Sequence, residues 1–108
     1  MIYLCNTFSV HMLGRLNVNN SRTIRIRRIS SIETGNILKS NAFRSFYGHE
    51  ESVKHLSRYL HLKVPVCRGT VNLEKGDILI IATISSKRDW EKGLKPYPKW
   101  RFFELELK

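Results

Sequence analysis

The residue in this sequence best suited to chemistry is His49, which lies directly before a predicted helix. Gly48 ends the preceding segment, and Glu50 and Glu51 follow it as the kind of acidic residues that the helix dipole favours in a first turn. A helix start is a ready anion site, because its first backbone N–H groups have no partner within the helix. An imidazolium placed there can give a proton to a leaving oxygen. The alternative is a histidine that only caps the helix.

The remaining histidines and the cysteines do not build a metal site around His49. His49, His55 and His61 recur every six residues, and six residues turn a helix by about 600°, so the three side chains point to different sides. Cys5 and Cys67 are too few for a disulfide framework or a zinc site, and we expect buried thiols in a reducing compartment. No glycine-rich phosphate loop and no nucleophile elbow is present. We therefore expect neither a metal nor a cofactor.

Apolar periodicity predicts the elements that position these residues. The clearest helix covers residues 50–61, where Val53, Leu56 and Leu60 share one face. Ser30 and Glu33 match a capping box and predict a short helix after it. Strand patterns cover five ranges, the third of them weakly: 2–5, 23–29, 67–73, 78–84 and 102–107.

The strand patterns differ in what they predict for the two faces of a sheet. Residues 78–84 are nearly all apolar, which fits a central strand buried on both faces. Residues 102–107 alternate and predict one wet face, and residues 23–29 predict a half-buried strand with a basic outer face. Residues 85–98 are polar and basic and read as a loop. The order of elements does not alternate strictly, so we predict one α+β domain over residues 1–108, with a mixed sheet of roughly five strands and two or three flanking helices.

The charge of the chain implies an anionic partner. The chain has 19 Lys and Arg against nine Asp and Glu, which gives a formal net charge of +10 on 108 residues. Nucleic acid, a nucleotide and an anionic membrane surface all fit this excess. No apolar run reaches the roughly 18 residues of a membrane span. Residues 1–13 lack a basic leader and a small-residue cleavage site, so we expect no signal peptide and a cytoplasmic location.

Two groups of residues support nucleic-acid binding from the pattern alone. Arg25, Arg27 and Arg28 fit a basic strand face, and aromatic residues lie among basic ones in the range 87–101. Aromatic rings among basic side chains suit stacking on bases. The alternative is that these aromatic rings cover an edge of the core or a dimer interface. The aromatic residues of that range are Trp90, Tyr97 and Trp100.

Three segments carry a resemblance to a known family. The first is Ile2–Leu13, a short strand followed by Asn-Thr-Phe-Ser at positions 6–9; the second is Tyr47-Gly48-His49 with the helix after it. The third runs from Arg68 through Leu-Glu-Lys-Gly-Asp at positions 73–77 to Ser85, and resumes at Phe-Phe-Glu in positions 102–104. In order and spacing these segments resemble the viral anti-CRISPR ring nucleases and their cellular relatives. The likeness spans most of the chain and is weakest between residues 14 and 40.

This resemblance implies a homodimer that binds cyclic tetra-adenylate, the second messenger of type III CRISPR defence. It implies a phosphodiester cleavage without metal, in which a ribose 2′-hydroxyl attacks the adjacent phosphate in line and the 5′-oxygen leaves. The products are linear di-adenylates with a cyclic phosphate end, and the effector nucleases that the messenger activates are switched off. The host cell cytoplasm is then the place of action for a protein encoded by a virus.

The resemblance also implies roles for individual residues. His49 matches the family's catalytic histidine, the general acid on the leaving oxygen. Arg88 and Glu91 preserve the spacing of a second arginine and a glutamate if one residue is inserted; without the insertion Lys87 stands in the arginine's place, and Trp90 in the glutamate's. We favour Arg88, because a guanidinium braces two phosphate oxygens. The residues matched to ligand binding are Asn6, Ser9, His11, Arg68 and Lys87.

Departures from the family pattern keep other functions open. Glu51 stands where a small hydroxyl residue is usual, and His11 replaces an asparagine. One alternative is a non-catalytic basic nucleic-acid-binding protein of a mobile element, which would ignore His49 and bind with a steep salt dependence. Another is a sponge of the same fold that binds the messenger without cutting it. The basic surface also fits secondary nucleic-acid binding beside the enzyme activity.

Overall fold

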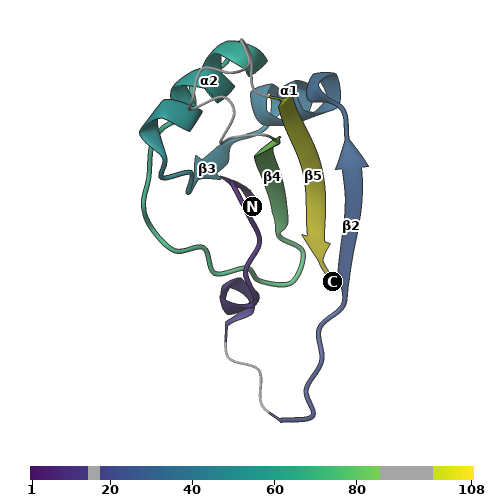
Figure 1. The fold of residues 1–108 in the computed structure, drawn as a ribbon. Helices are drawn as coiled ribbons and strands as arrows, with labels where there is room; N and C mark the ends of the chain where they lie inside the picture. Colours follow the sequence, from purple (N-terminus) through teal and green to yellow (C-terminus); the bar gives the residue numbers. More distant parts are fainter. Residues whose placement is uncertain (15–17, 86–98) are drawn as a thin grey trace.

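The computed structural model describes residues 1–14, 18–85 and 99–108, and its centre is a five-stranded mixed sheet. The strand order is β2-β5-β4-β1-β3, with β1 parallel to β3 and β4, and with β5 antiparallel to both β4 and β2 (Figure 1). Two α-helices accompany the sheet, so the predicted α+β fold is confirmed. The elements are β1 (Ile2–Cys5), the 3₁₀ helix η1 (Val10–Leu13), β2 (Ile24–Ile29), α1 (Ser31–Ser40), β3 (Phe43–Ser45), α2 (Glu50–Leu60), β4 (Ile78–Ser85) and β5 (Lys99–Leu107).

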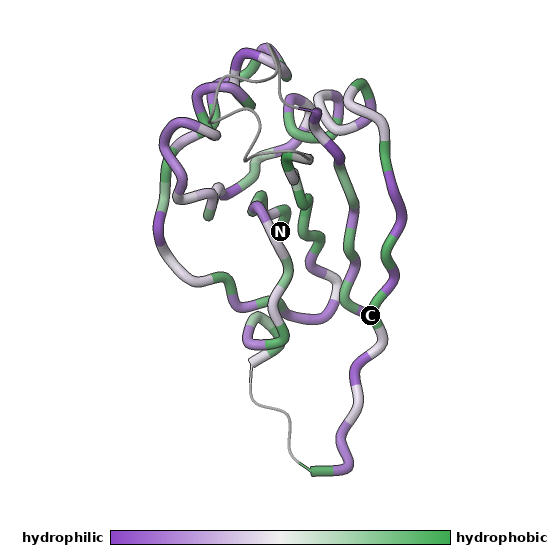
Figure 2. Tube along the Cα trace, in the orientation of Figure 1, coloured by the Kyte–Doolittle hydropathy of each residue, from purple (hydrophilic) through white to green (hydrophobic). Residues whose placement is uncertain are grey.

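Strand β4 is buried on both faces, as its apolar run predicts. Leu79, Ile80 and Ala82 have no exposed surface, and the hydrophobic colour is almost continuous along this strand in Figure 2. Leu79 belongs to one apolar cluster and Ile80 to another, because neighbouring side chains of a strand point to opposite faces. The helices cover the face that carries Ile80. Helix η1 and the segment of residues 67–74 pack on the other.

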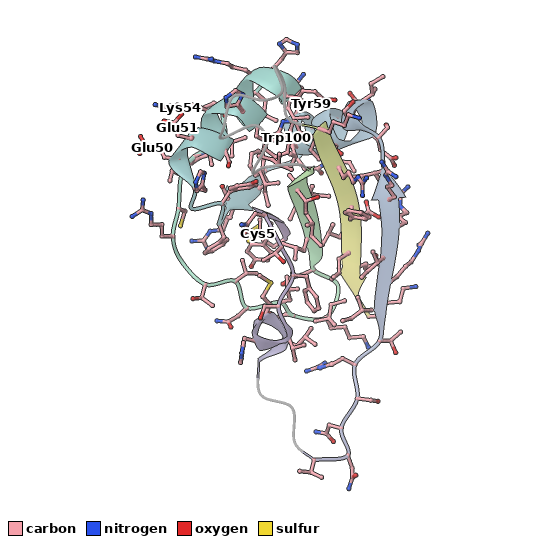
Figure 3. All side chains as sticks on the ribbon, viewed as in Figure 1. Cys5, Glu50, Glu51, Lys54, Tyr59 and Trp100 are labelled. Carbon is pink, nitrogen blue, oxygen red and sulfur yellow. The ribbon has the colours of Figure 1, made fainter. Side chains whose placement is uncertain are left out.

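Helix α2 forms where the periodicity places it, from Glu50 to Leu60. Val53, Leu56 and Leu60 are buried against the sheet, while Glu50, Glu51 and Lys54 point away from it in Figure 3. Burying this stripe removes apolar surface from water at roughly 25 cal/mol per Å². The helix therefore holds its first residue, and the histidine before it, at a fixed place beside the sheet.

Helix α1 starts with the predicted cap. The Ser30 hydroxyl accepts a hydrogen bond of 3.0 Å from the Glu33 backbone N–H, and the helix follows from Ser31 to Ser40. The Glu33 carboxylate does not reach back to complete a capping box. It accepts instead from Arg27 Nη2 at 2.7 Å, which ties the first turn of α1 to strand β2.

The predicted strand at residues 67–73 is wrong, although its alternation is real. Val71 and Leu73 are buried with an exposed Asn72 between them, but the segment forms no ladder. It crosses the sheet face in extended form, and Leu73 N donates to the Met12 carbonyl at 2.7 Å. The fifth strand is instead β3, whose three residues are too few to show a period. The predicted loop at 85–98 falls almost wholly outside the described residues.

The faces predicted for strands β5 and β2, which pair with each other, also need correction. Phe102, expected on a wet face, is 2% exposed because the helices cover that side of β5. Arg27 belongs to no open basic face: its Nε donates to Glu104 Oε1 at 3.0 Å. Arg28 lies on the opposite face of β2, and Ile26, expected inside, is 57% exposed. Strand β2 is an edge strand, so side chains on both of its faces reach solvent.

Cys5 and Cys67 are free thiols, the first buried and the second partly exposed. Across the described ranges of the chain, no helix is long and apolar enough to cross a membrane.

Candidate functional site

The carboxyl ends of three parallel strands meet at one edge of the sheet and form a pocket of about 180 Å³. This edge is the usual place for a ligand in sheets with parallel strands. Asn6 follows β1, Thr83 and Ile84 end β4, and the chain after β3 leads directly to the start of α2. The pocket is lined by Asn6, Tyr47, His49, Ser52, Thr83 and Ile84.

His49 is the N-cap of α2 and presents one ring nitrogen to the protein. Its Nδ1 accepts a hydrogen bond of 3.2 Å from the Ser52 backbone N–H and lies 2.8 Å from the Ser52 hydroxyl. An N–H can be accepted only by an unprotonated nitrogen, so the neutral ring carries its proton on Nε2. The residue is exposed while Ser52 is 2% exposed. Nε2 is therefore the nitrogen available to a ligand in the pocket.

Tyr47 closes the inner wall of the pocket as a neutral phenol. Its side chain is 3% exposed, and this burial raises its pKa to about 12, with a further contribution from Cys5. A side-chain hydrogen bond with Ser52 acts in the opposite direction on this pKa. At neutral pH the phenol is therefore protonated and can offer a hydrogen bond.

Arg68 lies beside the pocket rather than in its wall. Its Nε donates to the Gly48 carbonyl at 3.3 Å, directly before His49 in the chain. A Cβ at Gly48 would lie 3.0 Å from Arg68 Cγ and 3.4 Å from its Cα, which is tighter than ordinary contact. Within the part of the chain that the structure describes, no carboxylate pairs with Arg68. The rest of its guanidinium group is available to an anion.

The other residues singled out from the sequence lie in several places. Asn6 lines the pocket with His49. Ser9 caps η1, where its hydroxyl accepts from the His11 backbone N–H at 3.3 Å, and the exposed His11 belongs to that 3₁₀ helix. Neither residue lines the pocket. The remaining three, Lys87, Arg88 and Glu91, lie outside the described residues.

Sequence reasoning did not select three residues that the structure brings to the pocket. Ser52 stands three residues after His49, the spacing at which an N-cap side chain meets a backbone N–H, and that spacing is a usable signal. Thr83 is the first polar residue after the apolar run of β4, with Ser85 two residues later. Tyr47 had no signal of its own, because an aromatic residue before a helix is usually part of the core.

The negative charge of Glu51 is paired with a lysine of the same helix. Glu51, the departure from the family pattern, is two-thirds exposed and lies 3.6 Å from Lys54 Nζ, on the outer side of α2. Among the described residues no cluster of three His, Cys, Asp or Glu side chains could hold a metal ion. The polar groups at and beside this pocket include the His49 imidazole, the Ser52 and Thr83 hydroxyl groups and the neighbouring Arg68 guanidinium.

Comparison with known proteins supports the fold and gives a family. No curated protein matches the sequence. Among solved structures, the chain is similar to B116 of Sulfolobus turreted icosahedral virus, with a TM-score of 0.70, 20% identity and 97% of each chain covered. A family model described as STIV B116-like matches residues 2–95. Since that match spans most of the sequence, the chain belongs to the STIV B116-like family, which is named after a viral protein.

Proposed function

We propose that this protein is a metal-independent ring nuclease that binds and cleaves cyclic tetra-adenylate. The observation that carries the proposal is the geometry of His49: Nδ1 is fixed by Ser52 and Nε2 is open to a pocket at a helix N-terminus. That arrangement suits a phosphate ligand, because the first N–H groups of α2 and the helix dipole favour negative charge there.

The pocket supplies a general acid for phosphodiester cleavage. A ribose 2′-hydroxyl loses its proton to solvent and attacks the adjacent phosphorus, the bond from phosphorus to the 5′-oxygen breaks, and the proton from Nε2 of the His49 imidazolium goes to that oxygen. The products are a 2′,3′-cyclic phosphate and a free 5′-hydroxyl. Arg68 would brace the phosphate through guanidinium N–H groups that do not contact Gly48. The roles of Lys87, Arg88 and Glu91 depend on the family resemblance alone.

The size of the pocket supports a homodimer as the working form. A volume of about 180 Å³ is below the roughly 300–1,000 Å³ typical of sites for drug-sized ligands. A ring of four nucleotides therefore extends over much more surface than this pocket offers. Two copies related by a twofold axis would present two His49 side chains to a symmetric ring, and two cuts give two di-adenylates. Size-exclusion chromatography with light scattering tests this form, and a monomer would contradict it.

The deciding experiment incubates the protein with labelled cyclic tetra-adenylate in EDTA and separates the products. We expect conversion to linear di-adenylate with a cyclic phosphate end. His49→Asn keeps a side chain that caps a helix and removes the acid, so cleavage should fall by about 10²–10⁴-fold. His61→Asn, about 18 Å along the same helix, is the matched control.

Other outcomes of this experiment would indicate a different function for the protein. Tight binding of an intact ring would show a sponge, and salt-dependent binding of RNA or DNA without ring binding would show a nucleic-acid-binding protein. Equal cleavage by the wild type and His49→Asn would overturn the proposed mechanism.

A further inference from the structure

Strand β2 has one edge to which no other described strand is bonded. It stands at the end of the order β2-β5-β4-β1-β3, and among the described strands it pairs with β5 alone. In Figure 1 it is the outermost strand of the sheet, and the described residues place no helix beside its outer edge. An open edge is a row of backbone donors and acceptors to which another strand can be added. We call this row, residues 24–28, the β2 edge.

The hydrogen-bond pattern of the β2–β5 ladder shows which backbone groups the β2 edge offers. Lys108 N donates to the Thr23 carbonyl at 2.9 Å, so Thr23 and Lys108 form a hydrogen-bonded pair. In an antiparallel ladder every second pair is of this kind, and the residues between such pairs turn their N–H and C=O groups away from the partner strand. Within the part of the chain that the structure describes, no hydrogen bond reaches these outward groups. The residues that carry them are Ile24, Ile26 and Arg28.

Ile26 supplies an apolar contact at the middle of the β2 edge. Its side chain is 57% exposed, although Leu105, its partner on β5, has no exposed surface. Single exposed apolar residues are common on protein surfaces, but this one stands among outward backbone groups. A strand added along the edge would place one of its side chains against Ile26 on the same face. An apolar side chain at that position would remove the exposed surface of Ile26 from water.

The two faces of β2 differ in charge. On one face Arg27 forms ion pairs with Glu33 of α1 and Glu104 of β5, at 2.7 Å and 3.0 Å. The other face carries Ile26 and Arg28, because residues two apart in a strand point the same way. Arg28 is exposed, and no carboxylate of the described residues forms an ion pair with it. The β2 edge therefore presents a positive charge next to an apolar side chain.

The arginines of β2 disfavour a second copy of this chain on the β2 edge. Antiparallel registers that pair most of the strand are centred on Arg25, Ile26 or Arg27, because outward groups must meet outward groups. These registers place Arg25 opposite itself, Arg25 opposite Arg27, or Arg27 opposite itself. Like charges directly opposite each other destabilise a strand pair. A strand with acidic side chains avoids this repulsion and can form an ion pair instead.

We propose that the β2 edge binds an extended acidic segment of a partner protein, which adds a strand to the sheet. The backbone of this segment bonds to the outward groups of the edge, and one of its apolar side chains packs on Ile26. A carboxylate two positions away in the segment pairs with Arg28. The site lies at the opposite end of the strand order from β3 and does not depend on cleavage at His49.

The test titrates the full chain with a labelled peptide, Thr-Glu-Thr-Val-Thr-Glu-Thr with blocked ends. A glutamate stands two positions from the valine on each side, so the peptide fits in either direction. We expect binding, measured by fluorescence anisotropy. A peptide with lysine in place of both glutamates should bind at least tenfold more weakly, because the ion pair becomes a repulsion. Equal binding of the lysine peptide would overturn the acidic partner.

Methylated peptides test the backbone half of the proposal. Methylating the valine nitrogen removes the N–H used in an antiparallel pair, and methylating the two flanking threonine nitrogens removes those of a parallel pair. Side chains and charges stay the same. One of the two peptides should bind about tenfold or more weakly than the parent peptide. Binding of both at the affinity of the parent would overturn strand addition.

Hydrogen exchange measured by NMR locates the bound peptide. With free peptide at ten times its dissociation constant, exchange at the outward amides should slow about tenfold. Unchanged exchange at these amides would overturn strand addition at this edge. Slow exchange there in concentrated protein without peptide would show a second copy on the edge, and slowing by a single-stranded RNA but not by the peptide would show a nucleic acid. Either result would overturn a protein segment as the ligand. The amides to follow are those of Ile24, Ile26 and Arg28.

Charge substitutions on the two faces of β2 assign the ion pair. Arg28→Glu should weaken binding of the acidic peptide about tenfold or more. Arg25→Glu is the matched control, because it makes the same change of charge at an exposed residue on the other face of the strand. An equal loss in both variants would show general electrostatic attraction and overturn the pairing with Arg28.

Ile26→Pro tests the edge from the side of the protein. The Ile26 N–H points outward, so proline there removes no hydrogen bond of the β2–β5 ladder, and edge strands tolerate proline at such positions. The variant should keep the circular dichroism of the wild type and lose peptide binding, while Ile26→Thr, which keeps the N–H, should bind more tightly than Ile26→Pro. His49→Asn should bind the peptide as the wild type does. Wild-type affinity in folded Ile26→Pro would overturn the site.

Discussion

Nδ1 of His49 lies 2.8 Å from Oγ of Ser52, in addition to accepting the Ser52 backbone N–H at 3.2 Å. A hydroxyl group both donates and accepts. The Ser52 hydroxyl can thus donate to the neutral ring and, after a rotation, accept from Nδ1–H of the imidazolium. The hydroxyl contact can therefore be kept in both protonation states, whereas the hydrogen bond from the Ser52 backbone N–H to Nδ1 forms only with the neutral ring.

His49→Ala should lower both the stability of the protein and its rate of cleavage, whereas His49→Asn should lower only the rate of cleavage. His49→Ala removes the N-cap acceptor of α2 and should destabilise the fold by about 0.5–2 kcal/mol. Asparagine is a good N-cap residue, so the free energy of unfolding of His49→Asn, measured in urea, should lie within a few tenths of a kcal/mol of the wild-type value. Equal loss of stability in both variants would mean that His49 stabilises the fold by something other than its role as N-cap acceptor.

Ser52→Ala should lower kcat about 10- to 100-fold and leave KM nearly unchanged. The imidazolium would lose an acceptor for Nδ1–H, and hydrogen bonds to charged groups contribute about 1.5–3 kcal/mol. Ser57→Ala is the control on the same helix, because its hydroxyl lies away from the pocket and accepts from the Val64 backbone N–H at 3.1 Å. That variant should lose stability and keep kcat. Steady-state kinetics on cyclic tetra-adenylate distinguish the two, and an unchanged kcat in Ser52→Ala would remove the positioning role.

Arg68→Ala should raise KM about 10- to 100-fold, because the phosphate of the proposed ligand would lose charge-assisted hydrogen bonds from the guanidinium. Arg68→Lys should recover part of the charge but not the contact to the Gly48 carbonyl. Arg44, an exposed arginine whose guanidinium lies 5.8 Å from the centre of the Phe46 ring, gives the control substitution to alanine. Equal effects at both positions would show that only net charge matters.

Tyr47 predicts a loss of stability at high pH. Burial raises its folded-state pKa to about 12, from about 10 in the unfolded chain. Tyr47 therefore ionises first in the unfolded chain. The stability that the neutral phenol gives to the folded state is complete below pH 10 and is lost as the pH rises to about 12. The loss is about 2–3 kcal/mol. Urea unfolding at pH 8, 10 and 12 should show that the free energy of unfolding falls less with pH in Tyr47→Phe than in the wild type. The same fall in both proteins would contradict the role given to Tyr47.

His61→Gly should stabilise the protein by about 0.5–1 kcal/mol. His61 ends α2 in the left-handed conformation, with φ of 53°, and Leu62 N donates to the Ser57 carbonyl at 3.0 Å as in a Schellman motif. Glycine adopts this conformation without the Cβ penalty. Thermal unfolding measures the gain, with His55→Gly inside the helix as the destabilised comparison. A lower Tm for His61→Gly would contradict the expectation.

The parts of the fold that the sequence predicts are those with a strong local signal. Helix α2 has an apolar stripe and acidic first-turn residues, and β4 has an unbroken apolar run. The errors come from burial that is set by distant segments. Residues 67–73 alternate because they cross a sheet face, and Phe102 is buried because α2 covers it. Neither cause is visible within a window of a few residues.

The site shows the same division. The start of α2 places His49 from the sequence alone, because capping is local. Its partners in the pocket, Asn6 directly after β1 and Thr83 in β4, are separated by 77 residues in the chain and share an edge only after the sheet has formed. Ser52 is polar on a helix, which most often means exposure, and only the structure shows its buried hydroxyl.

The missing side chain at Gly48 leaves room for Arg68 beside the residue that precedes His49. No positive φ is needed at this position, so the demand is for space and not for an unusual backbone. A single methyl group there would press on Arg68 while leaving every pocket-lining residue chemically intact. Position 48 thus behaves as a spacer whose width sets where the guanidinium sits relative to the imidazole. Gly48 is not itself a pocket-lining residue, yet its smallest possible change would press on the Arg68 side chain.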